Sequence, residues 1–162
     1  MTNYHLYDTP GIDIRFSGST CVVEIVDGKE ITLANVCDSK AVLGRLVNKK
    51  WEAIPLTTPQ CPSIPDEQAR IVAAGGIVSQ QSDSFGVLCG PHRVWIADRN
   101  NPVPGLAMSR AFGNSVAASV GVISKPVITR HTIDSKDRFL VLASDGIWEF
   151  LSNKEVINMI AK

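Results

Sequence analysis

The sequence predicts an α+β fold, in which antiparallel strands dominate and a few helices stand apart from one another. Two observations lead to this prediction. Runs of β-branched and apolar residues recur at short spacing with turn residues between them, as in an antiparallel sheet. Helical patterns occur only near residues 65 and 152, and neither gives the alternation of strand and helix that a parallel sheet requires.

The first half of the chain supplies most of the predicted strands. Residues 1–17 are polar and are expected to form a lead-in or loop. Residues 20–26 and 30–36 predict a hairpin around the turn dipeptide Asp27–Gly28. Residues 41–47 predict a third strand, so the three together suggest an antiparallel meander.

A helix is expected after the proline-rich loop at residues 55–65. Ser63 can cap it, and Pro65 suits its first turn. Two acidic residues, Asp66 and Glu67, favour its positive end, and Gly75–Gly76 predicts its stop.

The second half predicts fewer regular elements. Residues 77–105 are expected to be an irregular, mobile surface excursion. Residues 120–123 and 127–129 resemble strands, and residues 139–144 form an apolar run without alternation, which predicts burial on both faces. Ser152 and Glu155 predict a capping box ahead of a final amphipathic helix.

Size and charge exclude several classes of protein. The 162 residues are enough for one domain with a core, and 44% hydrophobic and 20% charged residues are ordinary globular values. Sixteen basic residues balance sixteen acidic ones, so no nucleic-acid partner is expected. No apolar run approaches the about 20 residues of a membrane-spanning helix, so no membrane partner is expected either.

The cysteine pattern favours reduced thiols. None of the four has the spacing of a zinc site or a CxxC motif, and two lie in apolar runs, where cysteine packs as a small hydrophobe. The first residues lack the pattern of a signal peptide. We therefore expect an intracellular protein, cytoplasmic or nuclear, with a secreted disulfide framework as the alternative. The cysteines are Cys21, Cys37, Cys61 and Cys89.

Asp145 is the main candidate for chemistry. It directly follows the apolar run at residues 139–144, and a carboxylate at a rigid strand end is a good ligand for Mg²⁺ or Mn²⁺. Glu149, four residues further on, could add a second oxygen. The alternative is an ordinary turn at Asp145–Gly146, and spacing alone favours the turn.

Three other patterns are ambiguous from the residues alone. Asp38 lies between two predicted strands and is either a ligand or a turn cap. Arg110 could bind phosphate or form a structural salt bridge. The histidines at positions 5, 92 and 131 are scattered, which is typical of structural roles. No nucleophile elbow or phosphate-binding glycine loop occurs, so covalent hydrolase and P-loop mechanisms have no support.

Six segments in order across residues 17–151 resemble the metal-dependent PPM family, the protein phosphatase 2C type, and its plant and protist members most. They are Ser17–Thr20, Leu33–Leu43, Glu67–Gly76, Arg93–Trp95, Pro104–Gly113 and Leu140–Glu149. The resemblance implies a four-layer αββα sandwich of two antiparallel sheets flanked by helices, of which this chain would form part.

The resemblance also implies a function. Mn²⁺ or Mg²⁺ ions would activate a water that attacks phosphoserine or phosphothreonine in protein substrates, without a phospho-enzyme. Asp145 would be the core metal ligand, with Asp38 and Glu149 at a further, weaker metal site. Residues 66–105 fall where the family carries its flap, a segment that affects substrate choice.

The chain also departs from the family pattern. Its Asp-Gly-His-Gly-Gly motif and its C-terminal Asp–Asn motif are absent; Cys37 and Asn114 replace a usual Gly and Asp, and residues 57–61 replace an Asp-His-Lys region. We therefore expect residues 1–162 to be an incomplete phosphatase domain, its C-terminal part, inactive alone. A degenerate module that binds phosphoproteins without catalysis is the alternative, and an unrelated α+β binding domain is a third reading. Open sheet edges predict a homodimer.

Overall fold

The computed structural model describes residues 2–96 and 103–162, and these form two compact units. The first unit consists of Met1–Thr20 and Gln60–Lys125. The second unit consists of Cys21–Pro59 and Pro126–Lys162. Each unit is described by itself below.

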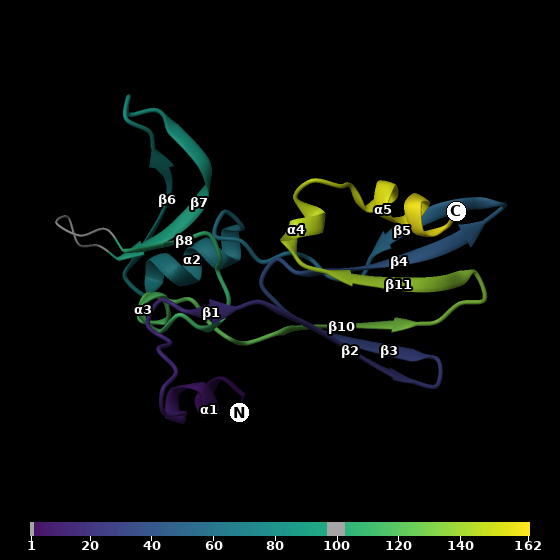
Figure 1. The fold of residues 1–162 in the computed structure, drawn as a ribbon, viewed down its shortest axis with the longest axis horizontal. Coiled ribbons are helices and arrows are strands. Elements are labelled where there is room, and N and C mark those ends of the chain that lie inside the picture. Colours follow the sequence, from purple (N-terminus) through teal and green to yellow (C-terminus); the bar gives the residue numbers. More distant parts are fainter. Residues whose placement is uncertain (1, 97–102) are drawn as a thin grey trace. The chain divides into compact units, whose positions relative to one another are not determined.

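The second unit contains two three-stranded antiparallel sheets, stacked one over the other (Figure 1). The first sheet has the order β10-β3-β2 and the second has the order β11-β4-β5. The strands of the first sheet are β2 (Cys21–Asp27), β3 (Glu30–Val36) and β10 (Val127–Thr132). Those of the second are β4 (Lys40–Val47), β5 (Lys50–Pro55) and β11 (Asp137–Ala143).

The predicted hairpin is confirmed, but the predicted meander is wrong. Strands β2 and β3 pair through a two-residue loop in which Gly28 has a φ of 58°. Strand β4 does not continue that sheet, because it pairs with β11 and β5 instead. The physical reason is burial: apolar side chains of β3 and β4, such as Leu33 and Leu43, pack against one another only when the strands lie in opposite layers.

A helix covers the outer side of the second sheet. Helix α5 (Asn153–Ile160) buries Val156 and Ile157, and its contacts are with β4 and β5. The predicted capping box is confirmed, since the Ser152 side chain accepts from Glu155 N and the Glu155 carboxylate accepts from Ser152 N. The short helix α4 (Asp145–Trp148) lies at the end of β11. Antiparallel sheets flanked by a helix confirm the α+β class.

Two details of the second sheet differ from the expectation. Strand β11 was expected to be buried on both faces, but Leu142 is 37% exposed because β4 is its one strand neighbour among the described residues.

Strand β5 was not predicted. Its turn is formed by Asn48 and Lys49, whose positive φ values of 49° and 62° match the twist of a tight hairpin.

The first unit has its own core and a small sheet of order β6-β7-β8. Ile71, Val94 and Val120 are buried there. The strands are β6 (Gly76–Ser82), β7 (Leu88–Ile96) and β8 (Pro104–Leu106), and a second pair is β1 (Gly18–Ser19) with β9 (Phe112–Gly113). The helices are α1 (Thr2–Asp8), α2 (Pro65–Ala73) and α3 (Ser115–Ala118).

Residues 77–105 were expected to be irregular, and this is wrong for most of the range. They pair as β6, β7 and β8, and residues 97–102 lie outside the described residues. The β6–β7 turn owes its order to Asp83, whose carboxylate accepts from the backbone N–H groups of Phe85 and Val87 at 2.9 Å each. The polar composition of residues 77–96 shows no strand pattern, so the sequence did not predict the β6–β7 hairpin.

Three smaller expectations for the first unit also fail. Residues 2–8 form helix α1 rather than loop. Residues 120–123 form a turn after α3 and one bridge to Arg110, since their valines are buried in a core rather than in a sheet. Helix α2 begins at Pro65 as predicted, but its N-cap is Ile64 rather than Ser63 and makes no side-chain hydrogen bond. Among the described residues, no helix is long and apolar enough to span a membrane.

Candidate metal centre

The register of the second sheet brings two candidate ligands to one end of the same strand pair. In the β4–β11 ladder, Lys40 lies opposite Ala143. Asp38 precedes Lys40 by two residues and Asp145 follows Ala143 by two, so both carboxylates leave the ladder at the same end. Antiparallel pairing therefore brings residues that are 107 positions apart in the sequence to the same end of one strand pair.

Asp145 begins helix α4 and its side chain is exposed to solvent. Gly146 follows it within the helix and has no positive φ. Asp145–Gly146 therefore begins a helix rather than forming an isolated turn. Asp145 is an accessible carboxylate at the end of a strand, which is what a metal ligand requires.

Asp38 follows a strained backbone position. Cys37 is fully buried and has a φ of 82°, a region that favours glycine. The side-chain amide of buried Asn35 donates to the Cys37 carbonyl oxygen at 3.1 Å, which holds this turn in place. Asp38 is half-buried immediately after it, so the turn directs a single carboxylate out of the core.

Glu149 lies one helical turn beyond Asp145. Its backbone N–H donates to the Asp145 carbonyl oxygen at 2.8 Å, and its side chain is exposed. Side chains four residues apart on a helix share one face, so Glu149 is placed on the side of α4 that carries Asp145. Carboxylate oxygens are the hard ligands that Mg²⁺ and Mn²⁺ prefer, so the three residues fit these ions in kind. Within the described residues, no three Asp, Glu, His or Cys side chains converge on one point.

Arg110 forms a salt bridge rather than an open phosphate site. Its guanidinium donates to the Glu67 carboxylate at 3.0 and 3.1 Å, and it also donates to the Lys125 carbonyl oxygen at 2.8 Å. Arg70 donates to the same carboxylate at 2.9 Å. Burial raises the pKa of Glu67, but hydrogen bonds from Arg110 and Arg70 outweigh it and lower that pKa to about 2. The sequence signal was the Glu67–Arg70 spacing, which was interpreted only as part of a family segment, while Glu67 itself was interpreted as a helix-dipole effect.

His131 is structural, as its isolated position in the sequence suggested. Its Nε2 lies 2.8 Å from Asp137, and Arg45 donates to the same carboxylate at 2.7 Å. Burial raises the pKa of Asp137, but the Arg45 and His131 hydrogen bonds lower it overall to about 2. This group joins β10 to β11 and β4, so it ties the two sheets together.

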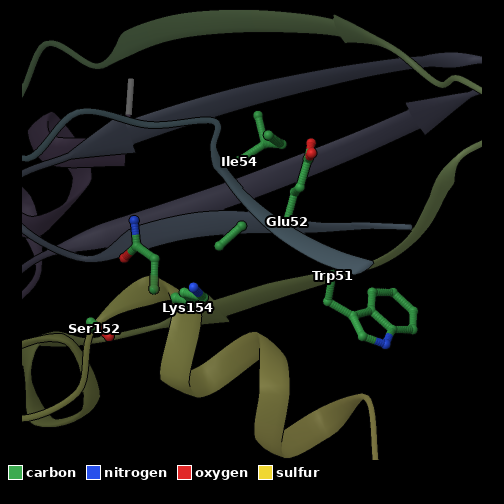
Figure 2. Close-up of a pocket in the computed structure, with 7 residues that line it drawn as sticks. Trp51, Glu52, Ile54, Ser152 and Lys154 are labelled. Atoms are coloured by element: carbon green, nitrogen blue, oxygen red, sulfur yellow. The ribbon is translucent and has the colours of Figure 1, made fainter. Parts of the chain in front are cut away.

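A groove of about 610 Å³ lies between strand β5 and the start of helix α5 (Figure 2). Glu52 and Ile54 point to one side of the strand and Trp51 to the other, while Ser152 and Lys154 come from the beginning of the helix. Neither Asp38 nor Asp145 lines it. The groove is therefore a feature separate from the carboxylate pair.

Comparison with known proteins identifies the family of this chain. The protein phosphatase 2C family model matches residues 9–162. "Probable protein phosphatase 2C 72" of Arabidopsis thaliana is 44% identical over 147 residues, covering 90% of this chain and 42% of that protein. "Probable protein phosphatase 2C 12" of Oryza sativa subsp. japonica is 40% identical over 152 residues, covering 93% and 38%.

A solved structure shares the fold. The serine-threonine phosphatase 2C from Toxoplasma gondii superposes with a TM-score of 0.78 at 22% identity, covering 89% of this chain and 46% of that one. This chain therefore has the fold of that structure. The chain belongs to the protein phosphatase 2C family, as the sequence motifs predicted. It spans about two fifths of the length of the plant relatives that it matches.

Proposed function

We propose that this chain is part of a metal-dependent serine/threonine protein phosphatase, whose substrates are phosphoserine and phosphothreonine proteins. The observation that carries the proposal is the β4–β11 register, which places Asp38 and Asp145 at one end of a strand pair. When bound there, Mn²⁺ or Mg²⁺ supplies a water of lowered pKa and stabilises charge on the phosphoryl oxygens.

The residues of this chain take distinct parts in that proposal. Asp145 is the principal ligand, because it is exposed and stands directly at the strand end. Asp38 and Glu149 flank it and serve a further, weaker metal position. Two observations support ranking them below Asp145. Asp38 is half-buried beside the Cys37 turn, and Glu149 lies one helical turn away from Asp145.

We also propose that residues 66–105 act as the flap and affect substrate choice. The described part of this range forms helix α2 and the β6–β7 hairpin. The hairpin is exposed from Gln81 to His92, so its polar side chains are available to a protein substrate.

The 162-residue chain is proposed to be inactive alone, as an incomplete domain. A centre that clamps both the attacking and the leaving oxygen uses two metal ions about 3.5–4 Å apart, and Asp38 and Asp145 offer few ligands for such a pair. Mg²⁺ also gives up its water reluctantly, so few carboxylates hold it weakly.

The test joins a binding measurement to an assay. In crystals soaked with Mn²⁺, anomalous scattering is expected beside Asp145 and absent in the Asp145→Ala variant. The pure chain with Mn²⁺ and a phosphothreonine peptide is expected to show no turnover. Robust turnover that disappears in Asp145→Ala would contradict the inactive-fragment proposal, and no anomalous peak would contradict the metal site.

A second function, binding of phosphoproteins without hydrolysis, is favoured by two substituted positions. Cys37 occupies a left-handed position where the family has Gly, and Asn114 is buried against Gly18 where the family has Asp. A longer chain that includes an Asp-Gly-His-Gly-Gly motif distinguishes the two functions. Turnover that depends on Asp145 in that chain supports the enzyme, and phosphopeptide binding without turnover supports the module.

Two further proposals concern surroundings. Exposed Cys89 is compatible with a reducing compartment, so we propose an intracellular location, cytoplasmic or nuclear.

Strands β2 and β10 are the edges of their sheet among the described residues, and unpaired edges favour pairing between chains. A homodimer through these edges is therefore proposed.

A further inference from the structure

Trp148 links helix α4 to both strands that carry the candidate ligands. Its indole Nε1 donates to the Ala143 carbonyl oxygen on β11 at 2.8 Å and to the Lys40 carbonyl oxygen on β4 at 3.2 Å. Lys40 and Ala143 are directly opposite each other in the ladder. One N–H group therefore spans the last paired residues of the two strands, at the end where Asp38 and Asp145 emerge.

The face of the Trp148 ring contacts a charged group. The Lys40 ammonium lies 4.7 Å from the centre of the Trp148 ring, within the range of a cation–π interaction. The ring is thus held through its N–H edge by two carbonyl groups and through its face by an ammonium. All of these partners belong to β4 or β11.

Helix α4 is short and lies at the surface. It spans four residues, none of them buried, and its N-cap Ser144 makes no side-chain hydrogen bond to the helix. A single helical turn is unstable by itself in water. The helix therefore depends on its attachment to the sheet, and Trp148 provides hydrogen bonds to both strands.

We propose that Trp148 is a positioning residue for the metal ligands, because its two hydrogen bonds fix the strand ends from which Asp38 and Asp145 emerge. This inference rests on the proposed metal centre. Groups that hydrogen-bond a metal ligand orient it, and their removal typically weakens metal affinity about 10- to 100-fold. Trp148 acts one step further back, through the backbone carbonyl groups of Ala143 and Lys40, so the lower end of that range is expected.

The experiment uses the 162-residue chain and Mn²⁺ alone. Titration with Mn²⁺ broadens the amide resonances of residues near the ion, so the amide signals of Asp38 and Asp145 report the dissociation constant. Trp148→Phe keeps an aromatic ring over Lys40 and removes the N–H donor. We expect the dissociation constant to rise about tenfold, with shifted resonances for residues 145–149 before metal is added.

Trp51→Phe is the matched control. Trp51 belongs to the same unit but does not lie on α4. Its ring centre is 5.3 Å from the ring centre of Phe139. This variant is expected to leave Mn²⁺ affinity unchanged. Equal affinity in the wild type and Trp148→Phe would overturn the positioning role alone. A wild type that shows no broadening at Asp145 would overturn the metal centre and the positioning role with it.

Discussion

The backbone at Cys37 holds a conformation that few side chains accept. Its φ of 82° lies in the left-handed region, where a Cβ atom crowds the following carbonyl group. The side chain is fully buried, so the strain is held by surrounding packing rather than released. This position comes directly before Asp38, so backbone strain lies next to a proposed ligand.

Substitution of Cys37 separates the strain from the loss of the thiol. Cys37→Ala removes the sulfur and keeps the strained Cβ, whereas Cys37→Gly removes both. We expect the glycine variant to be more stable than the alanine variant by about 1 kcal/mol, because only glycine accepts this φ without strain. Urea unfolding of both variants measures the difference. A less stable glycine variant would show that packing of the Cβ outweighs the backbone strain.

At the scale of elements, an ion cluster attaches helix α2 to the segments that surround it. Glu67 on the helix accepts from Arg110, and Arg70 donates to the carbonyl oxygens of Ser109 and Gly121 at 2.8 and 3.0 Å. The Glu67 side chain is only 5% exposed. Breaking a buried pair by removing one partner typically costs about 3–5 kcal/mol, because it leaves an uncompensated buried charge.

The cluster makes stability depend on acid pH. The pKa of Glu67 in the folded chain is about 2, below its usual value of 4.5. Its stabilising contribution is therefore complete above pH 4.5 and is lost as the pH falls from 4.5 toward 2. We expect the free energy of unfolding of the wild type to fall in this range, and that of Glu67→Gln to start lower at pH 7 and fall less steeply.

Urea unfolding at several pH values measures this dependence. Asp137 also has a lowered pKa of about 2 and contributes in the same acid range, so the Glu67 share is read from the difference between wild type and variant. Parallel pH profiles for the two proteins would contradict the ion-cluster account. Asp66→Asn is the control, because that carboxylate is exposed at the start of the same helix.

At the scale of the whole molecule, one sheet face of the second unit presents apolar side chains to solvent. On the outer face of the β10-β3-β2 sheet, Val23, Ile25 and Ile128 are 47%, 64% and 54% exposed. Val23 and Ile128 lie on either side of Ala34 in the register, so the three strands form one continuous patch. Contiguous exposed apolar surface on a sheet favours association.

Association should respond to a charge placed on that patch. Sedimentation velocity is expected to show dimers that increase with concentration, and Ile25→Lys is expected to shift the chain to monomer. Val72→Lys is the control, because Val72 is a comparably exposed residue on helix α2. A strict monomer at all concentrations would contradict the proposed homodimer, and association that Ile25→Lys leaves unchanged would exclude this patch.

The sequence by itself determined the local features of this protein and its family. The Ser152–Glu155 capping box, the Gly28 hairpin and the Gly75 helix stop were predictable, because each depends on residues within one turn of chain. The family followed from motifs in order, which the matching family model confirms. The β6–β7 hairpin was missed because the side chain of Asp83, rather than an apolar pattern, orders its turn.

Tertiary structure alone decided how those features combine. The sequence offered Asp38 and Asp145 as separate carboxylates and favoured a turn for the second. Only the pairing of β4 with β11 brings them to one sheet end, because strand register depends on which faces bury the core. Trp148 was overlooked for the same reason: its partners at Lys40 and Ala143 become neighbours of each other only when the sheet has formed.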